Sequence, residues 1–258
     1  MIYDRGSGPP VVVIPGVQGR WEWMTPALDA LSAGCRTVSY SLAGDFGSGF
    51  KRGGGFDAYL DQLDDVFRRA ELERAALCGV SYGGVIALCY AATRPQRVSA
   101  LILVSSPGPG WTPNARQRQC IRRPWLMTPE FVATGPSRLW PEITAAFDRW
   151  PARIGFALRY AARIASAPSI PPLMASRMRL QQQQDLAAAC ARVSAPTLVV
   201  TGEPHLDRVV PVEATREYAA LIPGARYEMM ERTGHIGLVT RPGRFSAVVH
   251  GFVHAHDH

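Results

Sequence analysis

The chain has 258 residues, which fits one large domain or one domain that carries an insertion. Its composition, with 47% hydrophobic and 19% charged residues, is ordinary for a soluble globular protein, and no apolar run approaches the roughly 18 residues that cross a bilayer. The formal charge of +7 lies entirely in residues 112–190, which hold eleven arginines and four acidic residues, and no nucleic-acid motif accompanies it. We therefore expect neither a nucleic-acid partner nor stable membrane insertion.

The first six residues lack the basic start and apolar stretch of a secretory signal. The five cysteines are an odd number, widely spaced and without a Cys-x-x-Cys pair, which is typical of a reducing compartment and argues against a zinc site. We expect a cytoplasmic protein without a metal.

Strand-like and helix-like segments alternate along the chain, which predicts an α/β fold with a mostly parallel central sheet flanked by helices. Residues 11–14 form a continuous apolar run, as in strands that are buried on both faces. The expected strands are Val11–Ile14, Thr37–Tyr40, Ala75–Val80, Val98–Val104, Pro196–Thr201 and Ala225–Met230, and the expected helices are Asp57–Ala70, Tyr82–Thr93, Glu213–Leu221 and Pro242–Val253.

A proline-rich segment, residues 107–191, interrupts this alternation. Prolines at that density divide a helical region into short pieces, and nothing in the segment has the pattern of a sheet strand. We expect helices at Pro141–Phe147, Pro151–Ala165 and Leu173–Ala191. The chain is thus predicted to consist of a core, residues 1–106 and 192–258, and an inserted helical cap, residues 107–191.

The sequence Gly79-Val80-Ser81-Tyr82-Gly83 matches the Gly-x-Ser-x-Gly pattern of a nucleophile elbow. It lies where a predicted strand turns directly into a predicted helix, which is the setting that such an elbow requires. The turn exposes the serine hydroxyl above the carboxyl edge of the sheet, and glycines avoid collisions with the neighbouring strand and helix. Ser81 is therefore the predicted nucleophile.

A serine hydroxyl needs an adjacent base, and the base needs an acid to orient it. His235 follows the last predicted strand and so lies at the same edge as Ser81, whereas His250, His254, His256 and His258 have the pattern of a solvated tail. Asp207, in the loop after the strand at 196–201, is the predicted acid, and Glu203 in the same loop is the alternative. No acid lies between Val104 and Pro129, the other usual position.

An oxyanion intermediate needs hydrogen-bond donors. The backbone N–H of Tyr82, directly after the nucleophile, is expected to be one donor, and that of Val17, after the first long strand, the other. The side chain of Gln18 is either a further donor or a solvent-facing loop residue.

Together these residues resemble the α/β-hydrolase superfamily, specifically its cap-bearing serine hydrolases. The resemblance covers residues 9–106 and 192–253 and includes Val11-Val12-Val13-Ile14-Pro15-Gly16, Leu77-Cys78-Gly79-Val80-Ser81-Tyr82-Gly83-Gly84, Asp207-x-x-x-Pro211 and Gly234-His235. It implies hydrolysis of an ester, thioester, amide or activated carbon–carbon bond, without a metal or organic cofactor.

The chain departs from the superfamily pattern in several places. Pro15 stands where many relatives have histidine, and residues 41–47 lack the usual Arg-Gly-His type of pattern. Two extra residues separate Glu203 from Asp207. The short N-terminal part predicts that one or two of the usual eight strands are missing.

We expect a carboxylesterase-like hydrolase of a small, partly apolar substrate, with Gln18, Trp21, Trp23 and Trp125 as candidate substrate-binding residues. Three alternatives stay open: a carbon–carbon bond hydrolase that uses the same triad, an acyltransferase, and a non-catalytic ligand receptor on the same fold. The sequence does not indicate an oligomeric state.

Overall fold

The computed structural model describes residues 2–50 and 53–256. Its centre is a seven-stranded sheet in the order β1-β3-β2-β4-β5-β6-β7, in which β1 is antiparallel to β3 and all other neighbours are parallel. The strands are β1 (Ile2–Arg5), β2 (Pro10–Ile14), β3 (Arg36–Tyr40), β4 (Ala75–Val80), β5 (Val98–Val104), β6 (Thr197–Thr201) and β7 (Arg226–Met229). The predicted strands are confirmed, and β1 is an addition to them.

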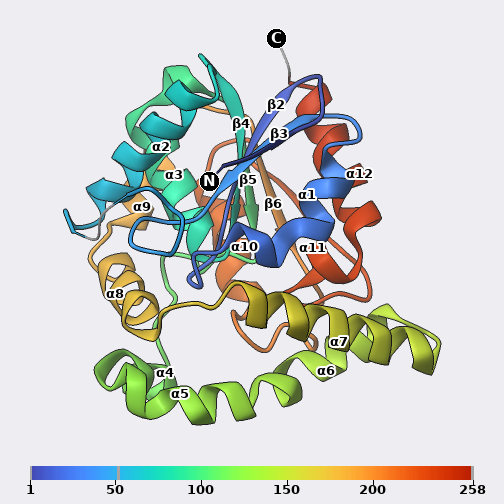
Figure 1. The fold of residues 1–258 in the computed structure, drawn as a ribbon. Coiled ribbons are helices and arrows are strands. Elements are labelled where there is room, and N and C mark those ends of the chain that lie inside the picture. The colour runs from blue at the N-terminus through green and yellow to red at the C-terminus, as the bar shows by residue number, and fades with distance from the viewer. Residues whose placement is uncertain (1, 51–52, 257–258) are drawn as a thin grey trace.

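Helices cover both faces of the sheet, as Figure 1 shows. On one face lie α2, α3, α9 and α10, and on the other α1 and α12, each face with its own buried apolar cluster. The helices that belong to the core are α1 (Thr25–Leu31), α2 (Asp57–Arg69), α3 (Tyr82–Thr93), α9 (Leu186–Arg192), α10 (Val212–Leu221), α11 (Gly237–Thr240) and α12 (Pro242–His254), with the 3-10 helices η1 (Trp21–Met24) and η2 (Pro95–Arg97). This arrangement confirms the predicted fold class.

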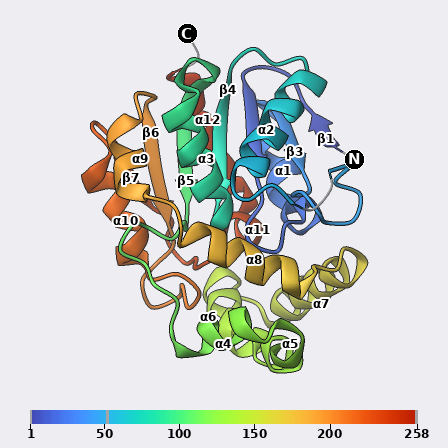
Figure 2. The ribbon, with the colours of Figure 1, turned by 90° about the vertical axis from the view of Figure 1, so that its left-hand side faces the viewer.

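A helical insert connects β5 to β6 and lies at the end of the sheet where the parallel strands finish (Figures 1 and 2). Its helices are α4 (Ala115–Arg122), α5 (Pro124–Ala133), α6 (Gly135–Ala146), α7 (Trp150–Ser166) and α8 (Pro171–Gln181). The single helix expected over residues 173–191 is two helices, because the chain turns at residues 182–185 and Asp185 caps the start of α9 through the Ala188 N–H. Helix α9 packs on α3, with the core.

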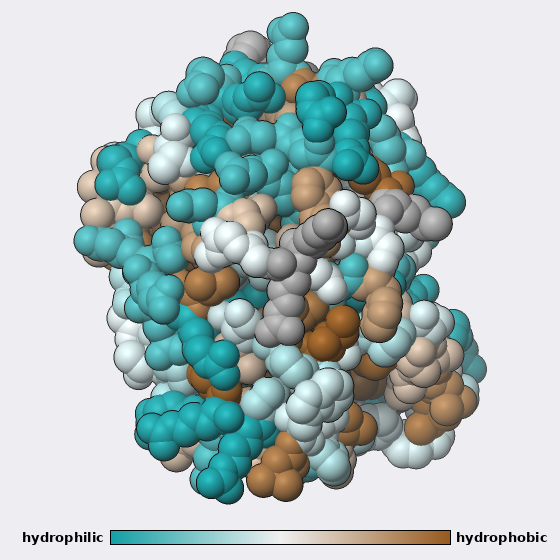
Figure 3. Space-filling model, turned by 60° about the vertical axis from the view of Figure 1, so that its left-hand side comes forward, coloured by the Kyte–Doolittle hydropathy of each residue, from teal (hydrophilic) through white to brown (hydrophobic). Residues whose placement is uncertain are grey.

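The insert differs from the core in what it exposes. In Figure 3 hydrophilic residues dominate the upper part of the visible face, and apolar residues are more frequent below, where the insert lies. Helix α5 has no buried residue, and Trp125 and Val132 on it are each 66% exposed. Within the described residues no helix has the length and apolar character needed to span a membrane.

One buried arginine joins the insert to the core. Arg177 of α8 has no exposed surface and is paired with Asp45, which is equally buried in the loop after β3. Its guanidinium also donates to the carbonyl oxygens of Val17, at 2.9 Å, and Ala43, at 3.2 Å, and to the Tyr59 hydroxyl. Burial raises the pKa of Asp45, and the charge of Arg177 opposes this increase.

The loop after β2 is shaped to make room for this pair. Gly19 has φ +76°, and a Cβ on it would lie 2.0 Å from the Asp45 carboxylate and 2.4 Å from the Arg177 guanidinium. Only glycine fits both this backbone conformation and this space.

We predict that Arg177→Ala lowers the free energy of unfolding by about 3–5 kcal/mol, because it leaves Asp45 buried without its counter-charge. Urea denaturation of the purified protein measures this loss. Arg159→Ala, which removes an exposed arginine from α7, is the matched control, with an expected change below about 0.5 kcal/mol. Equal losses in the two variants would contradict the role given to the buried pair.

Candidate active site

Ser81 lies at the sharp turn between β4 and α3, as the sequence predicts. Its backbone has φ +53° and ψ −120°, a region that non-glycine residues rarely occupy and that often marks functional sites. A Cβ on Gly79 would lie 2.4 Å from backbone atoms of α3, and one on Gly83 would lie 2.2 Å from the Ile14 carbonyl oxygen. Both glycines are therefore required for the close approach of α3 to β2 and β4.

A neighbouring serine supports this turn. Ser106, which is buried and is the second residue after β5, donates a hydrogen bond of 2.8 Å from its hydroxyl to the carbonyl oxygen of Ser81. The sequence analysis did not identify Ser106. The only feature of the sequence that points to this serine is its place just after β5, the strand next to β4.

Asp207 and His235 meet at the same edge of the sheet. Asp207 follows β6 and His235 follows β7, and the distance between Asp207 Oδ2 and His235 Nδ1 is 3.2 Å. The other carboxylate oxygen of Asp207 accepts from the N–H groups of Val209 and Val210, both at 3.0 Å. The carboxylate is 1% exposed and the imidazole 13%, so this pair is largely shielded from water.

The alternative acid, Glu203, has other partners. Its carboxylate accepts from the Arg232 N–H at 2.5 Å and lies 3.5 Å from the His205 ring. Of the two acids in this loop, the structure brings Asp207 and not Glu203 to His235.

The pair changes the protonation of both partners. Burial opposes ionisation of Asp207, but the charge of His235, their hydrogen bond and the two backbone donors together hold the pKa of Asp207 below its usual value. Burial also opposes the imidazolium, yet the charge and hydrogen bond of Asp207 raise the pKa of His235 above its usual value. The arrangement therefore stabilises a positively charged His235, the form that a base adopts after taking a proton.

Among the described residues no hydrogen bond joins the Ser81 hydroxyl to His235. Such contacts are often long in enzymes without substrate and shorten in the substrate complex. Ser81, Asp207 and His235 nevertheless lie at one edge of the sheet. The strands that precede them, β4, β6 and β7, run parallel, so the segments that follow these strands begin at the same edge.

The two expected oxyanion donors both follow strands that end at this edge, β2 for Val17 and β4 for Tyr82. Tyr82 is the first residue of α3, where the N–H groups have no acceptor within the helix. Val17 lies in the tight turn after β2, which is closed by a hydrogen bond from Gly19 N–H to the Gly16 carbonyl, and its own carbonyl accepts from Arg177. Arg177 thus connects the insert directly to the turn that carries Val17, a link that local sequence patterns did not indicate.

Gln18 turns toward the nucleophile. A Cβ placed on Gly16 would lie 2.8 Å from Gln18 Oε1 and 3.3 Å from Ser81 Cβ. The Gln18 amide and Ser81 therefore both lie next to Gly16.

The three tryptophans expected at the substrate site have different surroundings. Trp23 donates its indole N–H to the carbonyl of Ala167 in the insert, at 2.8 Å. Trp21 packs against the Tyr3 ring of β1, with 5.4 Å between ring centres. Trp125 is largely exposed on α5. Of the three, Trp23 is the one that lies in the segment after β2 and also forms a hydrogen bond to the insert.

The C-terminal histidines have structural contacts. His250, His254 and His256 each hydrogen-bond through a ring nitrogen to a backbone carbonyl, and His258 lies outside the described residues. Of the described histidines, His250, His254 and His256 are not part of the site around Ser81.

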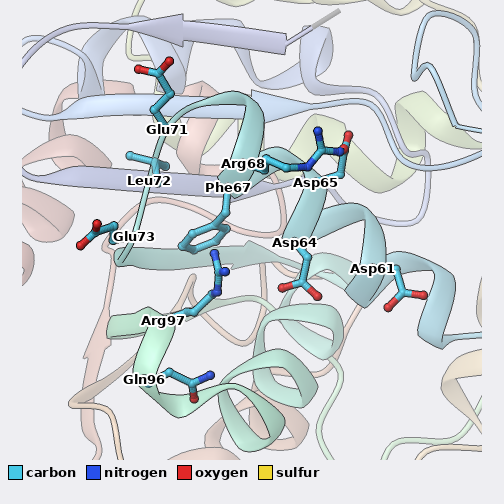
Figure 4. A pocket seen from close by; sticks show the side chains of 10 residues that line it. All are labelled: Asp61, Asp64, Asp65, Phe67, Arg68, Glu71, Leu72, Glu73, Gln96 and Arg97. Atoms are coloured by element: carbon cyan, nitrogen blue, oxygen red, sulfur yellow. The ribbon is translucent and has the colours of Figure 1, made fainter.

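A surface hollow of about 860 Å³ lies away from Ser81. Figure 4 shows the side chains that line it. It is lined by residues at the end of α2 and in the segments that lead into β4 and β5, so it opens at the amino edge of the parallel strands, opposite Ser81. The lining residues are Asp61, Asp64, Asp65, Phe67, Arg68, Glu71, Leu72, Glu73, Gln96 and Arg97.

Two curated proteins match along nearly their whole length. Pimeloyl-(acyl-carrier protein) methyl ester esterase from Nitrosomonas europaea is 27% identical over 261 residues, which cover 95% of this chain and 95% of that protein. The 2-hydroxymuconate semialdehyde hydrolase of Pseudomonas sp. (strain CF600) is 28% identical over 270 residues, which cover 98% of this chain and 89% of that protein.

The fold also matches solved structures. The enol-lactonase from Burkholderia xenovorans LB400 superposes with a TM-score of 0.80 at 20% identity, over 98% of this chain and 96% of that one, which is a likeness of fold alone. In sequence, residues 11–248 match the profile of the Alpha/beta hydrolase family, which confirms the predicted resemblance. The chain therefore belongs to the alpha/beta hydrolase family and is a hydrolase.

Proposed function

We propose that this hydrolase cleaves a carboxylic ester, or the related thioester or amide, of a small and partly apolar substrate. Ser81 is the nucleophile, His235 is the base and Asp207 is the acid that orients the base. The observation that carries the proposal is the 3.2 Å contact of His235 Nδ1 with the buried Asp207, at the edge of the sheet where Ser81 has its strained backbone.

The reaction follows from these positions. With Nδ1–H held by Asp207, the imidazole presents its unprotonated Nε2 to the serine hydroxyl and accepts its proton as Ser81 attacks the carbonyl carbon. The N–H groups of Tyr82 and Val17 stabilise the resulting oxyanion. His235 then protonates the leaving group, and water activated by the same histidine hydrolyses the acyl-enzyme.

The predicted division stands in this proposal, with residues 107–191 as the cap and residues 1–106 and 192–258 as the catalytic core, except that α9 is counted with the core because it packs on α3. Substrate binds between the two. The inward Gln18 amide supports a role in substrate binding, and so does the contact of Trp23 with the insert. Trp125 is exposed and Trp21 packs on Tyr3, and neither position supports a role in substrate binding.

Hydrolysis of a carbon–carbon bond next to a ketone is the second candidate, supported by the 28% identity to the 2-hydroxymuconate semialdehyde hydrolase. The same triad serves both reactions. Parallel assays with p-nitrophenyl esters of graded acyl length and with a vinylogous diketone acid separate them. Turnover of the diketone acid at a higher kcat/KM than every ester would replace the ester proposal with this one.

We predict that a fluorophosphonate probe labels the wild-type protein at Ser81 and that Ser81→Ala and His235→Ala abolish labelling. The probe needs a serine that is activated by a base, and loss of either residue lowers turnover by about 10⁴-fold or more in such triads. Mass spectrometry of the labelled peptide identifies the site, and circular dichroism checks that the variants are folded. A folded wild-type protein that stays unlabelled would instead support a non-catalytic ligand receptor.

We also predict that Asp207→Asn lowers the pKa of His235 by more than about one pH unit, since the carboxylate supplies the main interaction that raises it. NMR titration of isotope-labelled imidazole measures the midpoint. Glu203→Gln is the matched control and leaves the midpoint in place, because Glu203 contacts Arg232 and His205 instead. A midpoint that responds to Glu203 and not to Asp207 would reverse the assignment of the acid.

A further inference from the structure

A second buried carboxylate lies beside His235, and the proposed mechanism does not use it. Glu142 belongs to α6, in the insert, and is only 1% exposed. Ionised residues are rarely buried to this extent without partners, because the loss of hydration is costly. The partners of Glu142 therefore indicate why the carboxylate is there.

These partners come from the loop that carries His235 and from α11, which follows it. Glu142 Oε2 accepts a hydrogen bond of 3.0 Å from the Ile236 N–H, and a Cβ placed on Gly234 would lie 2.8 Å from the same oxygen. Glu142 Oε1 accepts from the Thr240 hydroxyl at 3.1 Å. The carboxylate thus contacts the backbone on both sides of His235, and at Gly234 only glycine leaves room for it.

The charges around His235 come from two directions. Asp207, from the loop after β6, holds the ring at Nδ1, and Glu142 approaches from the insert. Tyr160 of α7 is also close to Glu142 and stays uncharged, since burial raises its pKa. The negative charges of Asp207 and Glu142 both raise the pKa of His235.

The protonation of Glu142 itself depends on opposing effects. Burial raises the pKa of Glu142 above its usual value, and the N–H groups of the His235 loop, the charge of His235 and the Thr240 hydroxyl limit this increase. The ionised form is thus most stable when His235 carries its proton.

We propose that Glu142 is a positioning residue for His235, through which the insert holds the backbone of the catalytic base and stabilises its protonated form. This inference rests on the proposed role of His235 as the base. The two carboxylates have separate tasks: Asp207 selects the tautomer of the ring, and Glu142 anchors the peptide that carries it. The insert is then part of the catalytic machinery.

The test compares Glu142→Gln with wild type by the pH dependence of fluorophosphonate labelling. Labelling requires neutral His235, so the acid limb of the rate profile reports the pKa of His235. Glutamine keeps the size and an acceptor oxygen but removes the charge. The midpoint should fall by about half to one pH unit, which makes labelling well below the midpoint about three to ten times faster relative to the plateau.

Glu130→Gln is the matched control, since it removes the same charge from an exposed position of the insert, on α5, where Glu130 pairs with Arg116. Its acid limb should coincide with that of wild type. Thr240→Val is a second variant that keeps the carboxylate and removes one of its donors. Because this change raises the pKa of Glu142, the midpoint should fall by less than in Glu142→Gln.

The outcomes separate this inference from the proposed function. If wild-type protein is not labelled, the proposed function fails. If wild-type protein is labelled and the folded Glu142→Gln and Thr240→Val proteins both keep its midpoint, the proposed function stands and the role of Glu142 is refuted. A fall of the midpoint in Glu130→Gln equal to that in Glu142→Gln would also overturn it, because the effect would then be one of net charge.

Discussion

Parallel pairing of the central strands is the constraint on which the rest of this molecule depends. The strands β2, β4, β6 and β7 run in one direction, so the loops that follow them begin at the same edge of the sheet. These loops are far apart in the chain. Ser81, Asp207, His235 and the turn with Val17 all occupy such loops. The site is therefore a property of the sheet, and each loop supplies one group to it.

The insert is held against that edge by buried charge as well as by apolar packing. Arg177 of α8 reaches the turn after β2, and Glu142 of α6 reaches the loop after β7. Each is almost completely buried, and each has several backbone or side-chain partners, which buried charges require. By contrast α5 has no buried residue, so this helix is the part of the insert least constrained by the core.

Membership of the alpha/beta hydrolase family establishes hydrolysis and leaves the substrate open, because the same triad and fold serve several bond types. The matched relatives include an esterase and a hydrolase of a semialdehyde, at nearly equal identity. What distinguishes this chain is therefore expected in the insert and in the turn after β2, which face the reacting carbonyl in the proposal. Gln18 lies in that turn, and eleven of the arginines lie in or next to the insert.

The sequence by itself determined the strands β2 to β7, the helices α2, α3, α10 and α12, the elbow around Ser81 and the places of His235 and Asp207 in the chain, because each depends on a local pattern: an apolar run, a glycine pair, or a place after a strand. Only the tertiary structure decided which of Asp207 and Glu203 contacts His235. Both acids lie in one loop after β6, and they differ in the groups that their carboxylates contact. It also revealed β1, the helices α1 and α11, the division of α8 from α9, and the contacts of Arg177 and Glu142. Those two residues pair with groups about 90 to 160 positions away in the chain, and no local pattern encodes a partner at that distance.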